Sequence, residues 1–101
     1  MLSPNILPSA EKDMDRIASY YTEWMQSPEF AQTVIKGLYR AIYGMLAEHP
    51  DLGKPLPHSD GYRQFLVHRR HWVIYRQEDD ELVVRRVIPA KQFTSPEDID
   101  L

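Results

Sequence analysis

Residues 62–93 constrain the fold of this chain more than any other stretch. They contain three short apolar segments, at residues 62–67, 72–76 and 82–88, which are rich in Val, Ile, Tyr, Phe and Trp. That composition is typical of β-strands. The polar link at residues 77–81 predicts a hairpin loop of about four or five residues, and the link at 67–70 predicts a shorter one. We therefore predict an antiparallel three-stranded meander in the C-terminal half.

The same stretch concentrates positive charge. It carries seven of the twelve Lys and Arg residues of the chain: Arg63, Arg69, Arg70, Arg76, Arg85, Arg86 and Lys91. Its acids all lie in the 77–81 link. A single Arg on the outer face of an antiparallel sheet commonly does no more than face solvent, and we interpret each one in that way. For the cluster as a whole we favour a binding surface.

The N-terminal half shows the three- and four-residue spacing of amphipathic helices. Pro8 stands where helices favour proline, and the apolar residues that follow it predict a helix over residues 8–25. Ser27 is a candidate N-cap before Pro28, and a second apolar stripe runs to the region of His49, where Pro50 prevents continuation. The short link between the two predicts an antiparallel helical hairpin over residues 8–49.

The remaining segments complete a single domain of residues 1–101. Residues 5–7 are interpreted as the end of a short edge strand, and the Pro- and Gly-rich residues 51–62 as a loop. Pro89 ends the last strand, and residues 89–101 are predicted to form an irregular tail or one short turn. The fold class is therefore α+β in the order β-α-α-β-β-β, with the helical hairpin packed on a small antiparallel sheet at residues 62–88.

Composition excludes several classes of function. The chain has no cysteine, which removes disulfides and thiolate sites and fits a reducing cytoplasm. We expect neither a signal peptide nor a membrane-spanning segment. The net charge of −3 argues against a protein whose main role is to bind nucleic acid, and we predict no direct sequence-specific nucleic-acid contact. The spacing of His58, Asp60, His68 and His71 matches no metal site, so neither a metal nor a cofactor is predicted.

The segment HRRH, at residues 68–71, is the one motif with catalytic potential. A histidine titrates near neutral pH and can act as a general acid or base. Beside two Arg residues it would serve a ribonuclease, in which a base takes the 2′-hydroxyl proton and an Arg steadies the phosphorane. The same four residues also suit a soluble hairpin turn, so both interpretations stay open.

Five segments carry a resemblance by their order and spacing: ILPSAEKDMDRIASYY, LAEHPDLGKPL, GYRQF, HWVIYR and LVVRRVIPAKQF. On these segments the chain resembles the ParE/RelE superfamily of type II toxin–antitoxin toxins, and it is more similar to the ParE branch. The similarity covers nearly the whole chain.

The resemblance implies a helical hairpin on a small antiparallel sheet and a toxin that is neutralised by a cognate, ParD-like antitoxin. The disordered C-terminal segment of such an antitoxin folds onto the toxin, which gives a toxin–antitoxin hetero-oligomer in the cytoplasm. Well-studied ParE toxins bind DNA gyrase and block replication, whereas RelE-like relatives cut mRNA on the ribosome.

The C-terminal segment bears on that choice. RelE-like ribonucleases place a catalytic Tyr or His near the end of the last strand, but here Pro89 stands where many family members have His, and no Tyr follows Tyr75. The missing base and the acidic composition favour a gyrase inhibitor that is not an enzyme. The residues expected to bind the target are Arg63, Arg76, Arg86, Lys91, Gln92 and Phe93.

Two alternatives and one further surface remain as predictions. A ribosome-dependent mRNA endoribonuclease would use Arg63, His68, Arg69, Arg70, His71 and Arg86. A plain binding module, or a toxin that has lost its activity, is the other alternative. The antitoxin is expected to cover exposed apolar side chains of the helical hairpin, with Trp24, Tyr39 and Tyr43 among the candidates.

Overall fold

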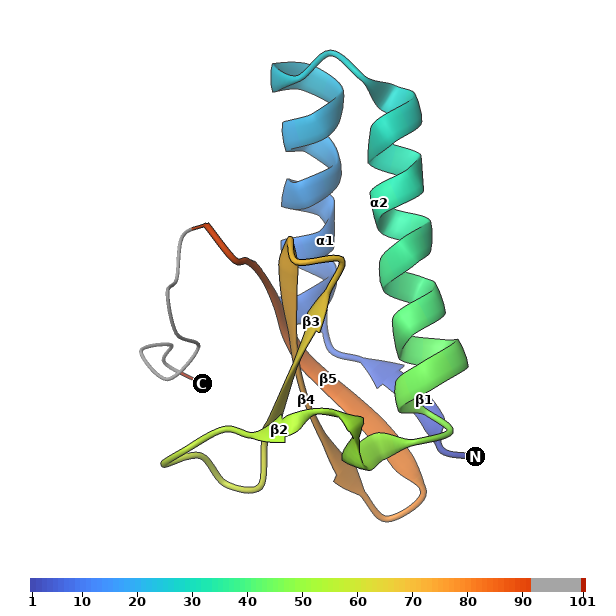
Figure 1. The fold of residues 1–101 in the computed structure, drawn as a ribbon, viewed down its shortest axis with the longest axis vertical. Helices are drawn as coiled ribbons and strands as arrows, with labels where there is room; N and C mark the ends of the chain where they lie inside the picture. The colour runs from blue at the N-terminus through green and yellow to red at the C-terminus, as the bar shows by residue number, and fades with distance from the viewer. Residues whose placement is uncertain (92–100) are drawn as a thin grey trace.

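The structure is a computed structural model that describes residues 1–91 and residue 101. Figure 1 shows a helical hairpin beside one sheet, with both termini near the sheet end of the molecule. The helical elements are α1 (Pro8–Ser19), η1 (Tyr20–Trp24), α2 (Pro28–Ala41), η2 (Ile42–Leu46) and η3 (Pro50–Leu52). The strands are β1 (Ser3–Ile6), β2 (Lys54–Pro55), β3 (Arg63–Val67), β4 (His71–Glu78) and β5 (Glu81–Pro89).

Both helices begin where the sequence predicts. Pro8 and Pro28 occupy first-turn positions, and the Ser27 hydroxyl accepts a hydrogen bond from the Phe30 amide at 3.3 Å. Each α-helix continues into a short π-helical segment, η1 and η2. The second helix ends at Leu46, three residues before the predicted end, because a turn precedes Pro50 and the short 3₁₀ helix η3.

The sheet has five strands in the order β1-β5-β4-β3-β2. The predicted meander is present, because β3, β4 and β5 pair antiparallel, and the predicted α+β fold class is confirmed. The sheet as a whole is mixed rather than antiparallel, because β1 pairs parallel to β5. The two helices separate β1 from the rest of the sheet, and a long crossover of this kind is what a parallel neighbour requires.

Two local predictions were wrong. The loop expected at residues 77–81 is a two-residue turn at Asp79 and Asp80, and the acids Glu78 and Glu81 pair with one another at the strand ends. Because they are charged, these residues were predicted to lie in a loop, but exposed strand ends accept charged side chains equally well. The loop predicted at residues 51–62 contains β2, where Lys54 and Pro55 pair with β3.

The main core lies between the helices and one face of the sheet. Its largest fully buried side chains include Leu38 and Ile42 from the helices and Tyr75 from β4. A smaller cluster of Leu56, Tyr62 and Ile74 lies on the opposite sheet face, and Trp72 and Leu101 pack against it. Trp72 and Tyr75 therefore lie on opposite faces of β4, as the strand alternation predicts.

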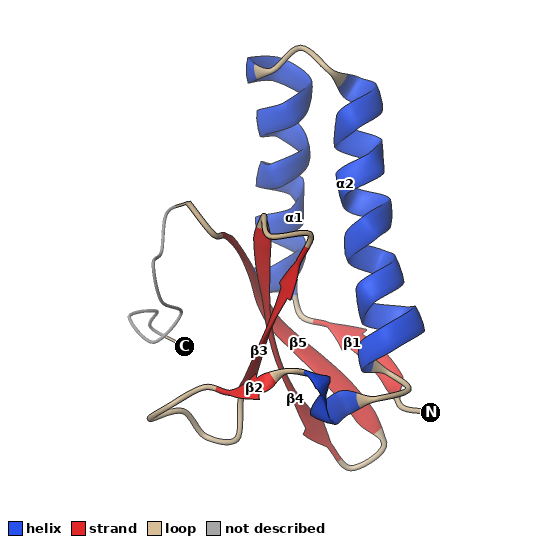
Figure 2. Cartoon of the chain, in the orientation of Figure 1, coloured by secondary structure: helices blue, strands red, loops and turns tan. Residues whose placement is uncertain are grey.

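The helical hairpin is longer than the sheet that it covers. In Figure 2 the far ends of α1 and α2 extend well past the ends of the strands. The molecule is accordingly elongated, with principal extents of 40 × 28 × 22 Å. The tip of the hairpin therefore cannot bury its apolar side chains against strands. None of the helices in the described part of the chain is long and apolar enough to cross a membrane.

Candidate functional site

Arg86 joins the sheet to the first helix. Its Nε donates to Asp13 Oδ2 at 2.6 Å and its Nη2 donates to Asp13 Oδ1 at 3.1 Å. The Val87 amide donates to the same carboxylate at 3.0 Å. Asp13 is only 6% exposed, and its hydrogen bond to Arg86 raises the pKa of that guanidinium. Arg86 therefore makes a structural ion pair, and much of its bonding capacity is directed inward.

Arg63 and Tyr75 fasten the same loop. The Tyr75 hydroxyl donates to the Pro50 carbonyl at 2.7 Å and accepts from the Gly53 amide at 2.8 Å. Arg63 Nη1 donates to the Gly53 carbonyl at 2.7 Å. Burial is the main cause of a raised pKa at Tyr75. We call this set (Pro50, Gly53, Arg63 and Tyr75) the loop clasp.

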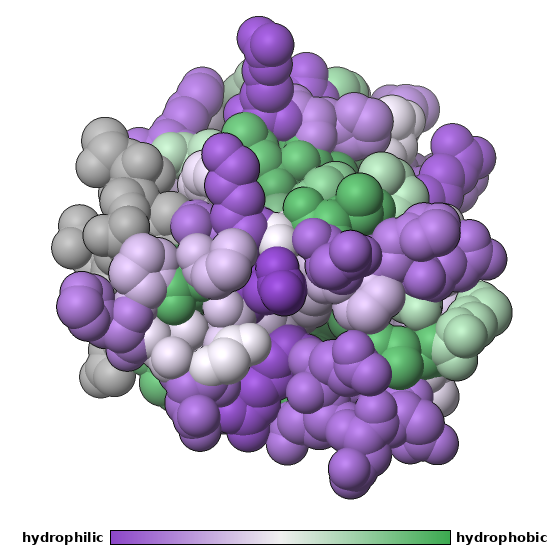
Figure 3. All heavy atoms as spheres, turned by 60° about the horizontal axis from the view of Figure 1, so that its bottom comes forward, coloured by the Kyte–Doolittle hydropathy of each residue, from purple (hydrophilic) through white to green (hydrophobic). Residues whose placement is uncertain are grey.

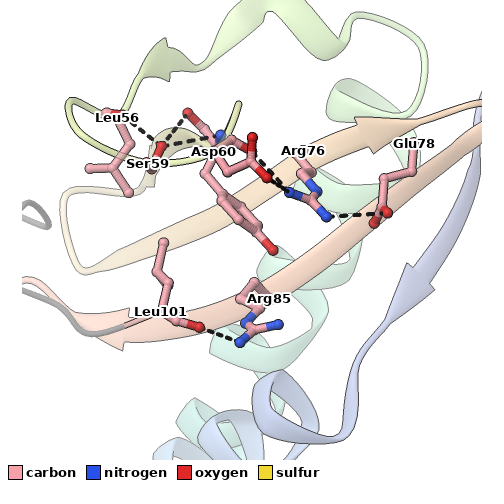
Figure 4. A network of polar contacts seen from close by, with 8 residues as sticks. Leu56, Ser59, Asp60, Arg76, Glu78, Arg85 and Leu101 are labelled. Carbon is pink, nitrogen blue, oxygen red and sulfur yellow. Dashed lines mark hydrogen bonds and ion pairs between the residues drawn. The ribbon is translucent and has the colours of Figure 1, made fainter.

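Arg76 and Arg85 lie on the outer face of the sheet. Figure 4 shows Arg76 between Asp60 and Glu78, and the ion pairs measure 3.3 Å to each. The hydrogen bond to Glu78 is the main cause of a raised pKa at Arg76. Arg85 donates to the backbone oxygen of Leu101. Both Arg residues thus have partners within the described part of the chain.

The HRRH segment forms the turn between β3 and β4. His68 and Arg69 adopt positive φ values of 51° and 59°, and both side chains are exposed. The Arg70 guanidinium lies 4.7 Å from the centre of the Phe30 ring. His71 is buried at 4% exposure against the Tyr21 ring, and burial, followed by the charge of Arg70, lowers its pKa to about 4.

The predicted target-binding residues therefore do not form one surface. Arg63 lies in the loop clasp, Arg76 on the outer face and Arg86 against α1. Lys91 is exposed just beyond β5, whereas Gln92 and Phe93 lie outside the described residues. The single basic face expected from the clustered charge is absent from residues 1–91, because neighbouring strand residues point to opposite faces.

The ribonuclease set is divided as well. The structure brings His68, Arg69, Arg70 and His71 together at one turn, but Arg63 lies at the other end of β3. The described residues contain no group of three or more His, Asp and Glu placed to bind a metal.

The three residues expected to bind an antitoxin are all exposed. Trp24, in η1 at the hairpin tip, is 80% exposed, and Tyr39 and Tyr43 are about half exposed with their rings 6.1 Å apart. Tyr20 and Met25 add further exposed apolar area near Trp24. Figure 3, which views the sheet end, shows a largely hydrophilic surface with separate hydrophobic patches. The hairpin tip lies at the other end of the molecule, and there the exposed Tyr20, Trp24 and Met25 form a candidate binding surface.

Sequence reasoning missed two residues that organise these sites. Asp13 follows Ala10 by three residues and precedes Ile17 by four, so it falls on the apolar stripe of α1. A lone acid on that stripe is a signal for a buried partner. Gly53 gave no such signal, because its close contact with Tyr75 depends on the tertiary fold.

Solved structures share this architecture. A chain of the chromosomal ParDE toxin–antitoxin system from P. aeruginosa gives a TM-score of 0.74 at 21% identity, over 88% of this chain and 96% of that chain. A chain of a RelBE toxin–antitoxin complex from Mycobacterium tuberculosis gives 0.65 at 18% identity, over 87% and 96%. A conserved hypothetical protein of Helicobacter pylori, solved in solution, gives 0.60 at 19% identity, over 90% and 97%. The chain therefore belongs to the class of proteins with the ParE/RelE-like fold.

The sequence decides the family within that class. Residues 5–92 match the family described as "ParE toxin of type II toxin-antitoxin system, parDE". Because this span is most of the chain, the chain belongs to the ParE toxin family, and the predicted ParE branch is confirmed. It is a toxin of a type II toxin–antitoxin system. Compared directly, no curated protein sequence matches it significantly.

Proposed function

We propose that this toxin inhibits DNA gyrase by binding it and catalyses no reaction of its own. Its membership of the ParE family is the observation that carries this proposal. The chemistry of the described residues supports it. His71 has a pKa of about 4 and is buried, so it is a poor proton acceptor near neutral pH. Pro89, at the end of β5, offers no proton-transfer group.

The test is a pair of assays with one preparation of pure toxin. Supercoiling by purified gyrase is measured across a toxin titration, beside cleavage of an mRNA on programmed ribosomes. The proposal predicts loss of supercoiling, or accumulation of cleaved DNA, while the mRNA stays intact. Intact supercoiling at a large excess of toxin would contradict it.

A ParD-like antitoxin is the proposed neutralising partner, with both proteins in the cytoplasm. Trp24, Tyr39 and Tyr43 are proposed to lie under its folding segment, because they expose aromatic area on the hairpin. Trp24→Ser removes the most exposed of these side chains and touches no core residue. We expect the variant to remain folded and toxic but to lose protection by the antitoxin in co-expressing cells. Unchanged protection would remove Trp24 from the antitoxin surface.

A ribosome-dependent endoribonuclease is the second candidate, because His68, Arg69, Arg70 and His71 meet at one turn. Codon-phased mRNA cuts that disappear in His68→Ala, together with normal supercoiling, would favour it over gyrase binding. Expression without antitoxin and without any growth defect would contradict both candidates and leave a toxin that has lost its activity.

A further inference from the structure

Two locally unfavourable features of the backbone lie close together at the turn between β3 and β4. His68 and Arg69 have consecutive positive φ values, which Gly and Asn adopt more readily in a hairpin turn. Gly37 lies inside α2, where glycine lowers helix propensity. A Cβ built at Gly37 would lie 3.3 Å from Cδ2 of His68. The helix therefore lacks a side chain where the His68 imidazole packs, and the turn accepts strain to place it there.

A pocket lies beside this contact. Its volume is about 240 Å³, and it opens between α2 and the turn. Three aliphatic side chains form its apolar part: Val34, Leu38 and Val67. Its polar part is Thr33, His68, Arg70 and His71. We call this cavity, defined by those seven residues, the turn pocket.

The charge at the turn pocket is uncompensated. The ion pairs of the described residues use Arg16, Arg76 and Arg86, and none includes Arg69 or Arg70. No acidic side chain lines the pocket. His71 is 4% exposed, but among the described residues the one buried side-chain nitrogen without a hydrogen-bond partner is Arg76 Nε, so the imidazole of His71 is not an orphaned group. Arg70 is already positioned by its contact with Phe30.

We propose that the turn pocket binds an acidic peptide segment of a partner protein. An apolar side chain of the segment contacts the aliphatic floor of the pocket, which is formed by Val34, Leu38 and Val67. A neighbouring carboxylate of the segment pairs with Arg70. A carboxylate and a guanidinium form a charge-assisted pair, which supplies the missing counter-charge. The aliphatic floor favours a peptide over a nucleic acid, because a phosphate backbone gains nothing from apolar contacts and is bound by broad basic surfaces. This inference does not depend on gyrase being the target.

The probe is a capped peptide of alternating leucine and glutamate, followed by amide and imidazole NMR shifts of the intact toxin. We expect saturable shifts at Gly37, His68, Arg70 and His71. A leucine–lysine peptide and a serine–glutamate peptide should give weaker shifts, because each lacks one of the two required chemistries. An oligonucleotide that shifts these residues at lower concentration than the peptide would overturn the proposal in favour of nucleic acid. Absence of shifts with every probe would overturn it outright.

Matched glycine variants sharpen the test. In Gly37→Ala the new Cβ would lie 3.3 Å from the His68 side chain. In Gly44→Ala, in η2, the new Cβ would have no atom within 4 Å. We expect peptide affinity to fall about tenfold in Gly37→Ala and to be unchanged in Gly44→Ala, with a similar loss in Arg70→Glu because the charge pair becomes repulsive. Arg70 is exposed, so Arg70→Glu stays informative if Gly37→Ala disturbs folding. Equal affinity of all three variants would contradict the proposal.

Discussion

The two ends of β3 satisfy their polar groups in opposite ways. At the Arg63 end, the loop clasp turns the Arg63 guanidinium, the Tyr75 hydroxyl and both backbone groups of Gly53 toward one another. At the His68 end, the backbone is strained and the cations of the turn have no acidic partner among the described residues. The hydrogen bonds at the Arg63 end stabilise the fold, whereas the strained backbone and the unpaired cations at the His68 end lower its stability. The comparison teaches that an Arg in a basic stretch identifies a binding surface only when nothing inside the protein already uses its charge.

The largest effect is expected from filling the loop clasp. In Gly53→Ala, the new Cβ would lie 2.4 Å from the Tyr75 hydroxyl oxygen and 2.9 Å from the Gln64 carbonyl oxygen. The Tyr75 hydroxyl cannot move without breaking the clasp, and the Gln64 carbonyl cannot move without shifting the backbone of β3, so the free energy of unfolding should fall by about 3 kcal/mol or more. Urea unfolding measures it, with Gly44→Ala as the control. A loss no greater than in the control would show that the clasp is loose.

The next effect is expected at the bridge between α1 and β5. Asp13→Ala leaves Arg86 and the Val87 amide without their acceptor. Breaking this pair should cost about 2–3 kcal/mol, less than for a fully buried ion pair, because Arg86 is partly exposed. Asp15→Ala, on the exposed face of the same helix, should change stability by less than about 0.5 kcal/mol. Similar losses of unfolding free energy in the two variants would show that the contacts of Asp13 do not stabilise the fold.

An acid-dependent effect is expected from His71. Its pKa is about 4 in the folded protein and 6.5 when unperturbed. Between these values the unfolded chain binds the proton more readily, so stability is full above about pH 7 and falls by about 2–3 kcal/mol as the pH drops toward 4. His71→Gln should flatten the part of the stability–pH curve between pH 5 and 7. A wild-type curve that is already flat there would contradict the burial of a neutral imidazole.

The smallest effect on stability is expected at the turn. Arg70→Ala loses an exposed contact with the Phe30 ring, worth about 0.5–1 kcal/mol. The variant should unfold close to the wild-type urea midpoint although it loses peptide binding. A destabilisation as large as that of Asp13→Ala would show that the turn stabilises the fold, and it would contradict the proposed difference between the two ends of β3.

Much of the fold followed from patterns that depend on neighbours in the sequence. Periodicity and the positions of Pro and Ser were enough to predict the helix starts at Pro8 and Pro28 and the three-strand meander. The order of the sequence segments was enough for the family resemblance. An edge strand ending near residues 5–7 was predicted, and β1 is that strand, but its parallel pairing did not follow because its partner β5 is more than seventy residues away. The contacts that the Arg residues make within the protein did not follow from the sequence either, for the same reason. Arg86 pairs with Asp13 across seventy-three residues, and no local pattern announces that contact.

The candidate site was predictable only in part. HRRH was visible as a motif, and Trp24, Tyr39 and Tyr43 were expected to be exposed. The turn pocket was not visible, because it exists only where Gly37 in α2 meets His68 in the turn. A mid-helix glycine is a weak signal by itself, and it gains meaning only from the side chain that lies against it.

The most direct test of inhibition by binding is its stoichiometry. Supercoiling is titrated with toxin at two gyrase concentrations that differ tenfold. A toxin that binds tightly and catalyses nothing should reach half-inhibition at a fixed ratio of toxin to gyrase, so the toxin required rises with the gyrase present. If catalytic traces of toxin abolish supercoiling at both gyrase concentrations, the toxin turns over, and the account of a non-enzymatic gyrase inhibitor is contradicted.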